Sequence, residues 1–73
     1  MKASAYYLSF GRRVCTLRYA MGWGQKELAS FMDTSQKVIS DIEVGKRMLN
    51  AHEIVKLCDL FAVSADQLLG RDE

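Results

Sequence analysis

The clearest pattern of apolar and polar residues lies between residues 25 and 45, where two short helical repeats flank four residues that favour a turn. On a helix with about 3.6 residues per turn, side chains three and four positions apart share a face, so Leu28, Phe31 and Met32 form one apolar stripe. The pattern therefore predicts two short helices joined by a tight turn, each with an apolar face toward a core.

The second repeat is amphipathic, with a different chemistry on each face. Val38, Ile39 and Ile42 fall on one arc and are expected to face the core. The opposite arc carries Val44 and four side chains that donate or accept hydrogen bonds: Gln36, Lys37, Ser40 and Asp41. Because such groups match the donors and acceptors on base edges, this face is able to read DNA.

The residues between the two repeats have the chemistry of a turn. Asp33 tolerates a left-handed backbone conformation. Thr34 or Ser35 can cap the following helix by accepting a hydrogen bond from one of its free N–H groups.

A long helix is predicted over residues 4–20, with Ser4 as its cap. Its apolar positions recur at spacings of three and four: Tyr7, Phe10, Val14, Leu17 and Met21. Gly11 inside this helix costs about 1 kcal/mol relative to Ala, which indicates that another helix approaches closely there.

Two more helices follow the central pair. Asn50 and Ser64 are each followed three residues later by Glu or Gln, the spacing of a capping box, and Gly70 ends the last helix. The sequence thus predicts an all-α fold, a compact five-helix bundle that forms a single domain over residues 1–73.

Positive charge is concentrated in the half of the chain that contains the central pair. Residues 1–50 hold eight Lys or Arg against four Asp or Glu, a net charge of +4, whereas residues 51–73 hold two against five, a net charge of −3. An ordinary solvated surface would explain this asymmetry, and so would contact with phosphates.

Other chemistry is sparse. Cys15 and Cys58 lack the spacing of metal ligands, so free buried thiols or a disulfide between them are the alternatives, and no metal or other cofactor is expected. His52, the single histidine, has no nucleophile or carboxylate at a spacing that would converge on it, so we expect no enzyme. Because the sequence shows neither a signal peptide nor a membrane-spanning run, a cytoplasmic location is expected.

Four segments in this order resemble the lambda-repressor-like helix-turn-helix proteins, of the phage repressor and Cro type. They are FGRRVCTLR at 10–18, GQKELA at 24–29, SQKVISDIEVGK at 35–46 and EIVKLCDLFAVSADQLLG at 53–70. The resemblance places the helix-turn-helix proper at residues 25–43. The chain departs from the family at Gly24, where Ser or Thr is usual, at Asp33, where Gly is frequent, and in lacking proline at 47–50.

The resemblance implies a site for double-stranded DNA. The matching base-reading positions are Ser35, Gln36, Lys37, Ser40 and Asp41. Gln25 matches a phosphate contact, and Lys46 and Arg47 would follow on phosphates. Asp41 would either accept a hydrogen bond from cytosine or orient Lys37. Arg18 and Glu43 match a buried ion pair, although two independent surface charges are the alternative.

Several apolar residues are left over by this scheme and are candidates for a homodimer interface, unless they are ordinary scattered surface residues. They are Met48, Leu49, Val55, Leu60 and Leu69. The resulting prediction is a sequence-specific transcriptional regulator, a repressor that binds a pseudo-palindromic operator as a dimer. The alternative is an antitoxin or other interaction module that uses the same fold to bind a protein partner.

Overall fold

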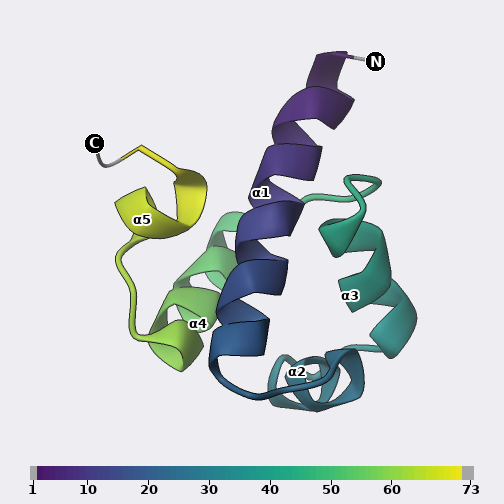
Figure 1. Ribbon diagram of the computed structural model, residues 1–73, viewed down its shortest axis with the longest axis vertical. Coiled ribbons are helices and arrows are strands. Elements are labelled where there is room, and N and C mark those ends of the chain that lie inside the picture. Colours follow the sequence, from purple (N-terminus) through teal and green to yellow (C-terminus); the bar gives the residue numbers. More distant parts are fainter. Residues whose placement is uncertain (1, 72–73) are drawn as a thin grey trace.

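The computed structural model describes residues 2–71, which form five helices and no strand. The helices are α1 (Lys2–Ala20), α2 (Gln25–Phe31), α3 (Gln36–Glu43), α4 (Ala51–Phe61) and α5 (Ala65–Leu69). α1 runs through the middle of the molecule, with α4 and α5 on one side and α2 and α3 on the other (Figure 1). The predicted all-α five-helix bundle is confirmed. No helix in residues 2–71 has both the length and the hydropathy needed to cross a bilayer.

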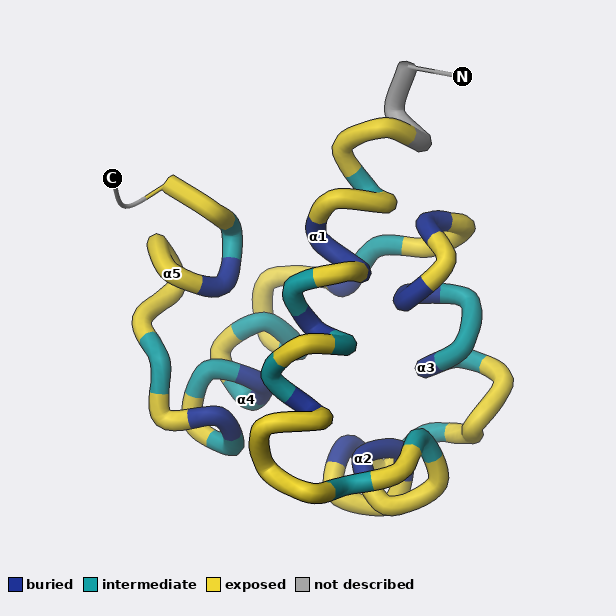
Figure 2. Tube along the Cα trace, viewed as in Figure 1, coloured by how far each residue is buried: buried dark blue, intermediate teal, exposed yellow. Residues whose placement is uncertain are grey.

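The core consists largely of positions that the helical periodicity selected, and Figure 2 shows buried positions on every helix, interrupted by exposed ones. The largest fully buried side chains come from all five helices: Phe10, Val14, Leu28, Ile39, Ile42, Leu57 and Leu68. Burying a side chain of this size stabilises the fold by about 1.5–3 kcal/mol. α1 contacts both α3 and α5, whereas α2 packs against α3 and α4 against α5, so α1 connects the two pairs of helices.

Both ends of α1 differ from the prediction. The helix begins at Lys2, so Ser4 lies inside it and is not its cap. Met21 lies in the turn beyond the helix and is exposed, because the chain has already left the helical path that would have carried its side chain to the core.

The predicted caps of the last two helices are present. The Asn50 side chain accepts from the Glu53 N–H at 2.8 Å, and the Glu53 carboxylate accepts from the Asn50 N–H at 3.0 Å. Ser64 and Gln67 repeat the arrangement at 3.0 and 2.9 Å. These side chains satisfy backbone N–H groups that a helix leaves without intrahelical partners.

The turn between α2 and α3 also follows the predicted chemistry. Asp33 adopts a positive φ of 56°, and the Ser35 hydroxyl caps α3 by accepting from the Val38 N–H at 3.3 Å. Gly24 provides no side-chain acceptor, but its own N–H donates to the Glu27 carboxylate at 2.6 Å. This contact holds the start of α2 without a Ser or Thr cap.

Two further apolar residues lie in environments other than those predicted. Phe31 is 44% exposed and packs on Trp23 at a ring-centroid distance of 4.7 Å, so it extends the apolar surface outside the core. Leu49, predicted to remain unburied, lies in the core. It directly precedes the Asn50 cap, the position from which a hydrophobic residue packs back toward the first turns of the helix.

Arg13 fastens α5 to α1 in a way that periodicity did not indicate. Its Nε donates to the Leu68 carbonyl at 2.9 Å and its Nη2 to the Leu69 carbonyl at 3.2 Å. Carbonyls at the end of a helix lack intrahelical donors and carry partial negative charge, so a guanidinium is well suited to them.

Gly11 is where α1 and α3 come closest. A Cβ at this position would collide with the carbonyl oxygen of Ile42 and would lie 2.8 Å from that of Glu43. The close approach predicted from the glycine is therefore confirmed.

We expect Gly11→Ala to lower the free energy of unfolding by about 1–3 kcal/mol, because the clash with rigid backbone outweighs the gain in helix propensity. Urea unfolding measures the change. Thr16→Ala, an exposed change on the same helix, is the control and should stay within about 0.5 kcal/mol of the parent. Equal stability of the Gly11→Ala variant and the parent would contradict the close contact.

Candidate nucleic-acid interface

The outer face of α3 presents the predicted polar side chains. Gln36 and Lys37 are exposed, whereas Ser40 and Asp41 are half-buried beside them. Lys37 Nζ lies 3.2 Å from an Asp41 carboxylate oxygen one turn along the helix. This pair directs the lysine along the helix, and its exposure limits its contribution to stability to about 0.3–0.5 kcal/mol.

A chain of hydrogen bonds connects this face to the interior. Gln36 Nε2 donates to Gln25 Oε1 at 3.3 Å, and Gln25 Nε2 donates to Glu43 Oε1 at 3.0 Å. Because Glu43 accepts only, the amide of Gln25 must direct its nitrogen inward and its oxygen toward Gln36. That oxygen in turn accepts from the nitrogen of Gln36, so the contact with Glu43 sets which way round both amides lie.

Arg18 and Glu43 form the buried end of this chain. Arg18 Nε and Nη2 donate to the two Glu43 oxygens at 2.7 and 3.0 Å, and each side chain is 6% exposed. Arg18 Nη1 also donates to the Trp23 carbonyl at 2.9 Å. The parallel two-bond geometry is the strongest that an arginine and a carboxylate make.

The pKa of each partner reflects this contact. Burial by itself raises the pKa of Glu43, but the hydrogen bonds from Arg18 and Gln25 outweigh burial, and the pKa lies below its ordinary value. The hydrogen bond to Glu43 raises the pKa of Arg18. Both groups are therefore charged at neutral pH although they are buried.

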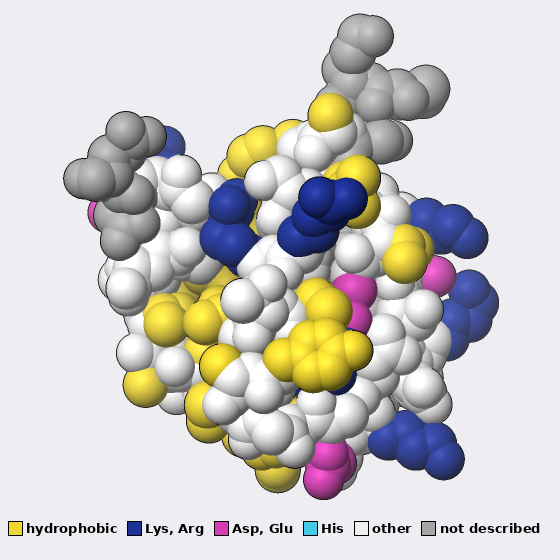
Figure 3. Space-filling model, viewed as in Figure 1, with side chains coloured by type: hydrophobic (Ala, Val, Ile, Leu, Met, Phe, Trp, Pro, Cys, Tyr) yellow, Lys and Arg dark blue, Asp and Glu magenta, His cyan; other side chains and the backbone are white. Residues whose placement is uncertain are grey.

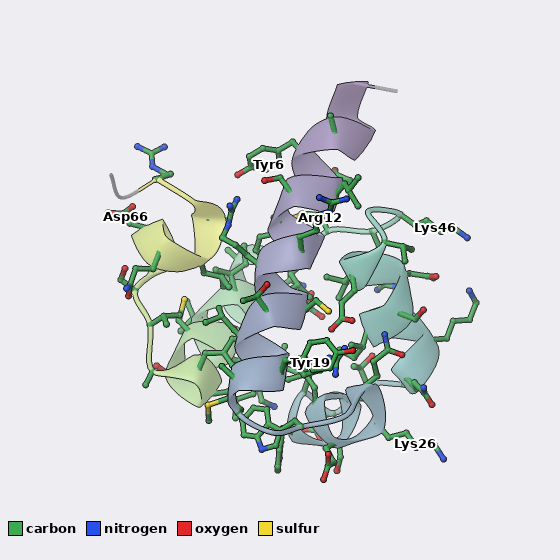
Figure 4. All side chains as sticks on the ribbon, in the orientation of Figure 1. Tyr6, Arg12, Tyr19, Lys26, Lys46 and Asp66 are labelled. Atoms are coloured by element: carbon green, nitrogen blue, oxygen red, sulfur yellow. The ribbon has the colours of Figure 1, made fainter. Side chains whose placement is uncertain are left out.

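Basic side chains border the same face. Lys26 of α2 and Lys46, beyond the end of α3, both extend away from the body of the molecule (Figure 4). Figure 3 shows Lys and Arg side chains spaced along this edge, and Lys37 and Arg47 are also exposed. The arrangement offers cations on both sides of the polar face of α3, as contact with two phosphate strands requires.

Ser35 has a second function at this face. Its hydroxyl oxygen accepts from the Val38 N–H as the cap of α3, which leaves its proton free to donate to a ligand.

Tyr19 lies beside this face, although the sequence did not predict it there. Tyr19 is 70% exposed, and its ring centroid lies 4.6 Å from Cζ of the Arg18 guanidinium. Its side chain extends from the end of α1 toward α2 and α3 (Figure 4). Its position next to Arg18 in the sequence was the available signal, but periodicity assigns it only to a solvent-facing side of α1.

The two thiols are free, and both are half-buried. Burial raises the pKa of Cys15 and of Cys58, so both favour the protonated form. Within residues 2–71 no three His, Cys, Asp or Glu side chains gather closely enough to hold a metal ion.

A helix-turn-helix family model matches residues 16–68, which include α2, α3, α4 and most of α5. The chain belongs to the helix-turn-helix family. The predicted lambda-repressor-like architecture is thereby confirmed, as is the prediction of a DNA-binding transcriptional regulator at the level of the family.

Two relatives from Bacillus subtilis (strain 168) carry the same domain. The HTH-type transcriptional regulator ImmR is 35% identical over 66 residues, which cover 90% of this chain and 52% of ImmR. The uncharacterized HTH-type transcriptional regulator YazB is 32% identical over 59 residues, 81% of this chain and 86% of YazB. The helix-turn-helix chain thus spans about half the length of ImmR and most of YazB.

A solved structure supports the same assignment. The restriction-modification controller protein C.AhdI from Aeromonas hydrophila superposes with a TM-score of 0.82 and 26% sequence identity. The match covers 93% of this chain and 99% of C.AhdI. The helix-turn-helix and the helices that support it therefore share one arrangement in both proteins.

Replacing Glu43 by Gln should lower the free energy of unfolding at neutral pH by about 3–5 kcal/mol, because the Arg18 charge would remain buried without a counter-charge. The pKa of Glu43 is below its ordinary value of 4.5, so its charge stabilises the folded state above that pH and the contribution is lost as the pH falls through the lower folded-state pKa. Urea unfolding across this pH range should show that the difference in free energy of unfolding between parent and variant becomes smaller as the pH falls.

The matched control is Asp59→Asn, which neutralises an exposed carboxylate of α4. It should change stability by less than about 0.5 kcal/mol at every pH. The charged state assigned to Glu43 would be contradicted if the difference in free energy of unfolding between Glu43→Gln and the parent stayed constant as the pH falls.

Proposed function

We propose that the chain is a sequence-specific DNA-binding regulator that inserts α3 into the major groove. The observation that carries this proposal is the hydrogen-bonded chain from Arg18 and Glu43 through Gln25 to Gln36. An exposed glutamine normally samples many rotamers, whereas the amide of this one donates to a second amide that is itself bonded to the buried Glu43. Preorganisation of this kind favours recognition of one pattern over general affinity for a charged surface.

The orientation of Gln36 selects the base that it can read. One N–H of its amide is used by Gln25, which leaves the second N–H and the carbonyl oxygen facing outward. These two groups match N7 and the N6 amino group of adenine. Lys37, directed by Asp41, is suited to the O6 and N7 acceptors of guanine, while Ser35 and Ser40 supply hydroxyls that suit any base.

Phosphate contacts would fix the register of α3 on the duplex. Gln25 retains its second amide N–H for this purpose, because only one is donated to Glu43. Lys46 and Arg47 are exposed beyond α3, and the Tyr19 hydroxyl is able to donate from the end of α1. These groups add affinity without adding sequence preference.

We also propose that the regulator acts as a dimer on a pseudo-palindrome, represses by occupying its site, and resides in the cytoplasm without catalytic activity. A domain of 73 residues supplies a small core, so a second copy would add stability. Met48, Leu60 and Leu69 stay half-buried at the margin of the core, and Val55 is 60% exposed. These four side chains remain candidates for the interface, whereas Leu49 belongs to the core.

The DNA proposal is tested by selection from a random duplex pool at about physiological salt, where contacts to phosphate alone are weakened. We expect a two-fold symmetric site in which Gln36→Ala and Lys37→Ala each relax one position per half, with a loss of about 1–3 kcal/mol of discrimination. Arg71→Ala, a loss of charge outside the interface, should leave the selected sequence unchanged. No enrichment for any of these proteins would contradict the proposal and favour a protein partner for α3.

The dimer proposal predicts that Val55→Lys shifts the sedimentation coefficient to that of a monomer without unfolding the chain. Val44→Lys is the matched control, because Val44 is similarly exposed at 55% but lies at the end of α3. A dimer that persists in the Val55→Lys variant, or dissociates equally in both variants, would remove Val55 from the interface.

A further inference from the structure

A groove of about 380 Å³ lies between α1 and α5, on a part of the surface that the proposed DNA contacts do not use. Its wall on α1 is formed by residues that recur every three or four positions, among them Ser9, Arg12 and Thr16. Its opposite wall is formed by Val63 and Gln67, from the start of α5 and the segment before it. This volume is in the range of sites that bind small molecules or short chain segments.

The floor of the groove is apolar. Leu17 and Val63 are half-buried against the core and turn their remaining surface toward the groove. Figure 3 shows hydrophobic side chains gathered between α1 and α5, below basic side chains on α1. An apolar side chain of a ligand would be removed from water here.

The rim of the groove consists of hydrogen-bond donors. Arg12 is exposed and forms no salt bridge within the described part of the chain (Figure 4). Gln67 Oε1 already accepts from the Ser64 N–H at 2.9 Å, so the amide nitrogen of Gln67 is its available group. Arg13 uses Nε and Nη2 for α5, and Nη2 also lies 3.4 Å from the Ser9 hydroxyl; among the described residues no hydrogen-bond acceptor is found for Nη1.

Acidic side chains are absent from the lining of this groove as the structure describes it. The acidic neighbour on α5, Asp66, lies on the outer side of the helix and 3.7 Å from the Arg71 guanidinium (Figure 4). The groove therefore combines positive charge, hydrogen-bond donors and an apolar floor, a combination complementary to carboxylates that flank an apolar side chain.

We propose that the groove between α1 and α5 binds an acidic segment of a partner protein. An apolar side chain of the segment packs on Leu17 and Val63, and its carboxylates accept from Arg12 and from the amide of Gln67. None of these residues belongs to the polar face of α3. The segment and a DNA duplex can consequently bind at the same time, and this inference stands apart from the proposed DNA function.

The test is a selection from a random library of short peptides displayed on phage, with the folded chain as bait. Enriched peptides should carry Asp or Glu on both sides of an apolar residue. In fluorescence anisotropy, an enriched peptide should bind the Arg12→Glu variant about tenfold or more weakly than the parent, because a charge contact becomes repulsive.

Gln67→Glu provides a second variant that keeps the fold. The carboxylate still accepts from the Ser64 N–H as the cap of α5, but the donor on the rim is replaced by an acceptor. It should also weaken binding of the peptide. Lys26→Glu makes the same reversal of charge at an exposed position of α2. Its affinity for the peptide should stay within about twofold of the parent's, since charges beyond a Debye length are screened.

Four results would overturn the proposal. One is the absence of acidic enrichment, and another is an equal loss of affinity in the Arg12→Glu and Lys26→Glu variants. A third is complete displacement of the peptide by inorganic phosphate alone, which would indicate a site for free anions. The last is dissociation of a dimer by Arg12→Glu, which would show that a second copy of this chain occupies the groove.

Discussion

The buried contact between Arg18 and Glu43 is the interaction on which the arrangement of the polar face of α3 depends most, because three helices meet at one carboxylate. Arg18 belongs to α1, Glu43 ends α3, and the same carboxylate receives the amide of Gln25 at the start of α2. A buried ion pair contributes little net stability, since the cost of removing two charges from water offsets their attraction. This ion pair instead sets the orientation of the side chains around it, because the donors of Arg18 and Gln25 all bind the one carboxylate of Glu43.

The backbone contact at Gly11 complements that ion pair. With no side chain at this position, α1 approaches the carbonyls of Ile42 and Glu43 at the end of α3. Apolar packing alone allows helices to slide or rotate with modest changes in energy. A close backbone contact and a two-bond ion pair restrict both movements at the same end of α3, so the outward face of this short helix is held at a defined angle.

The features that the sequence predicted well are local ones. Periodicity identified the buried positions of α3, and spacing identified the capping residues Asn50 and Ser64, since both depend on residues a few positions apart. Leu49 and Phe31 were misassigned because their burial depends on where distant helices lie. The contact of Gln25 with Glu43 joins residues 18 positions apart, so no local pattern predicted it. The family resemblance had singled out both residues, but for different contacts.

The contact between Arg13 and α5 affects the order in which parts of the chain can fold. Helix α5 has five residues, too few to be stable alone, and its terminal carbonyls are held by a guanidinium 55 and 56 positions earlier in the chain. During synthesis, α1 through α4 are translated before these carbonyls exist. The contact between Arg13 and α5 therefore forms only after the last turn of α5 has left the ribosome, and until then the part of α1 that α5 covers stays exposed.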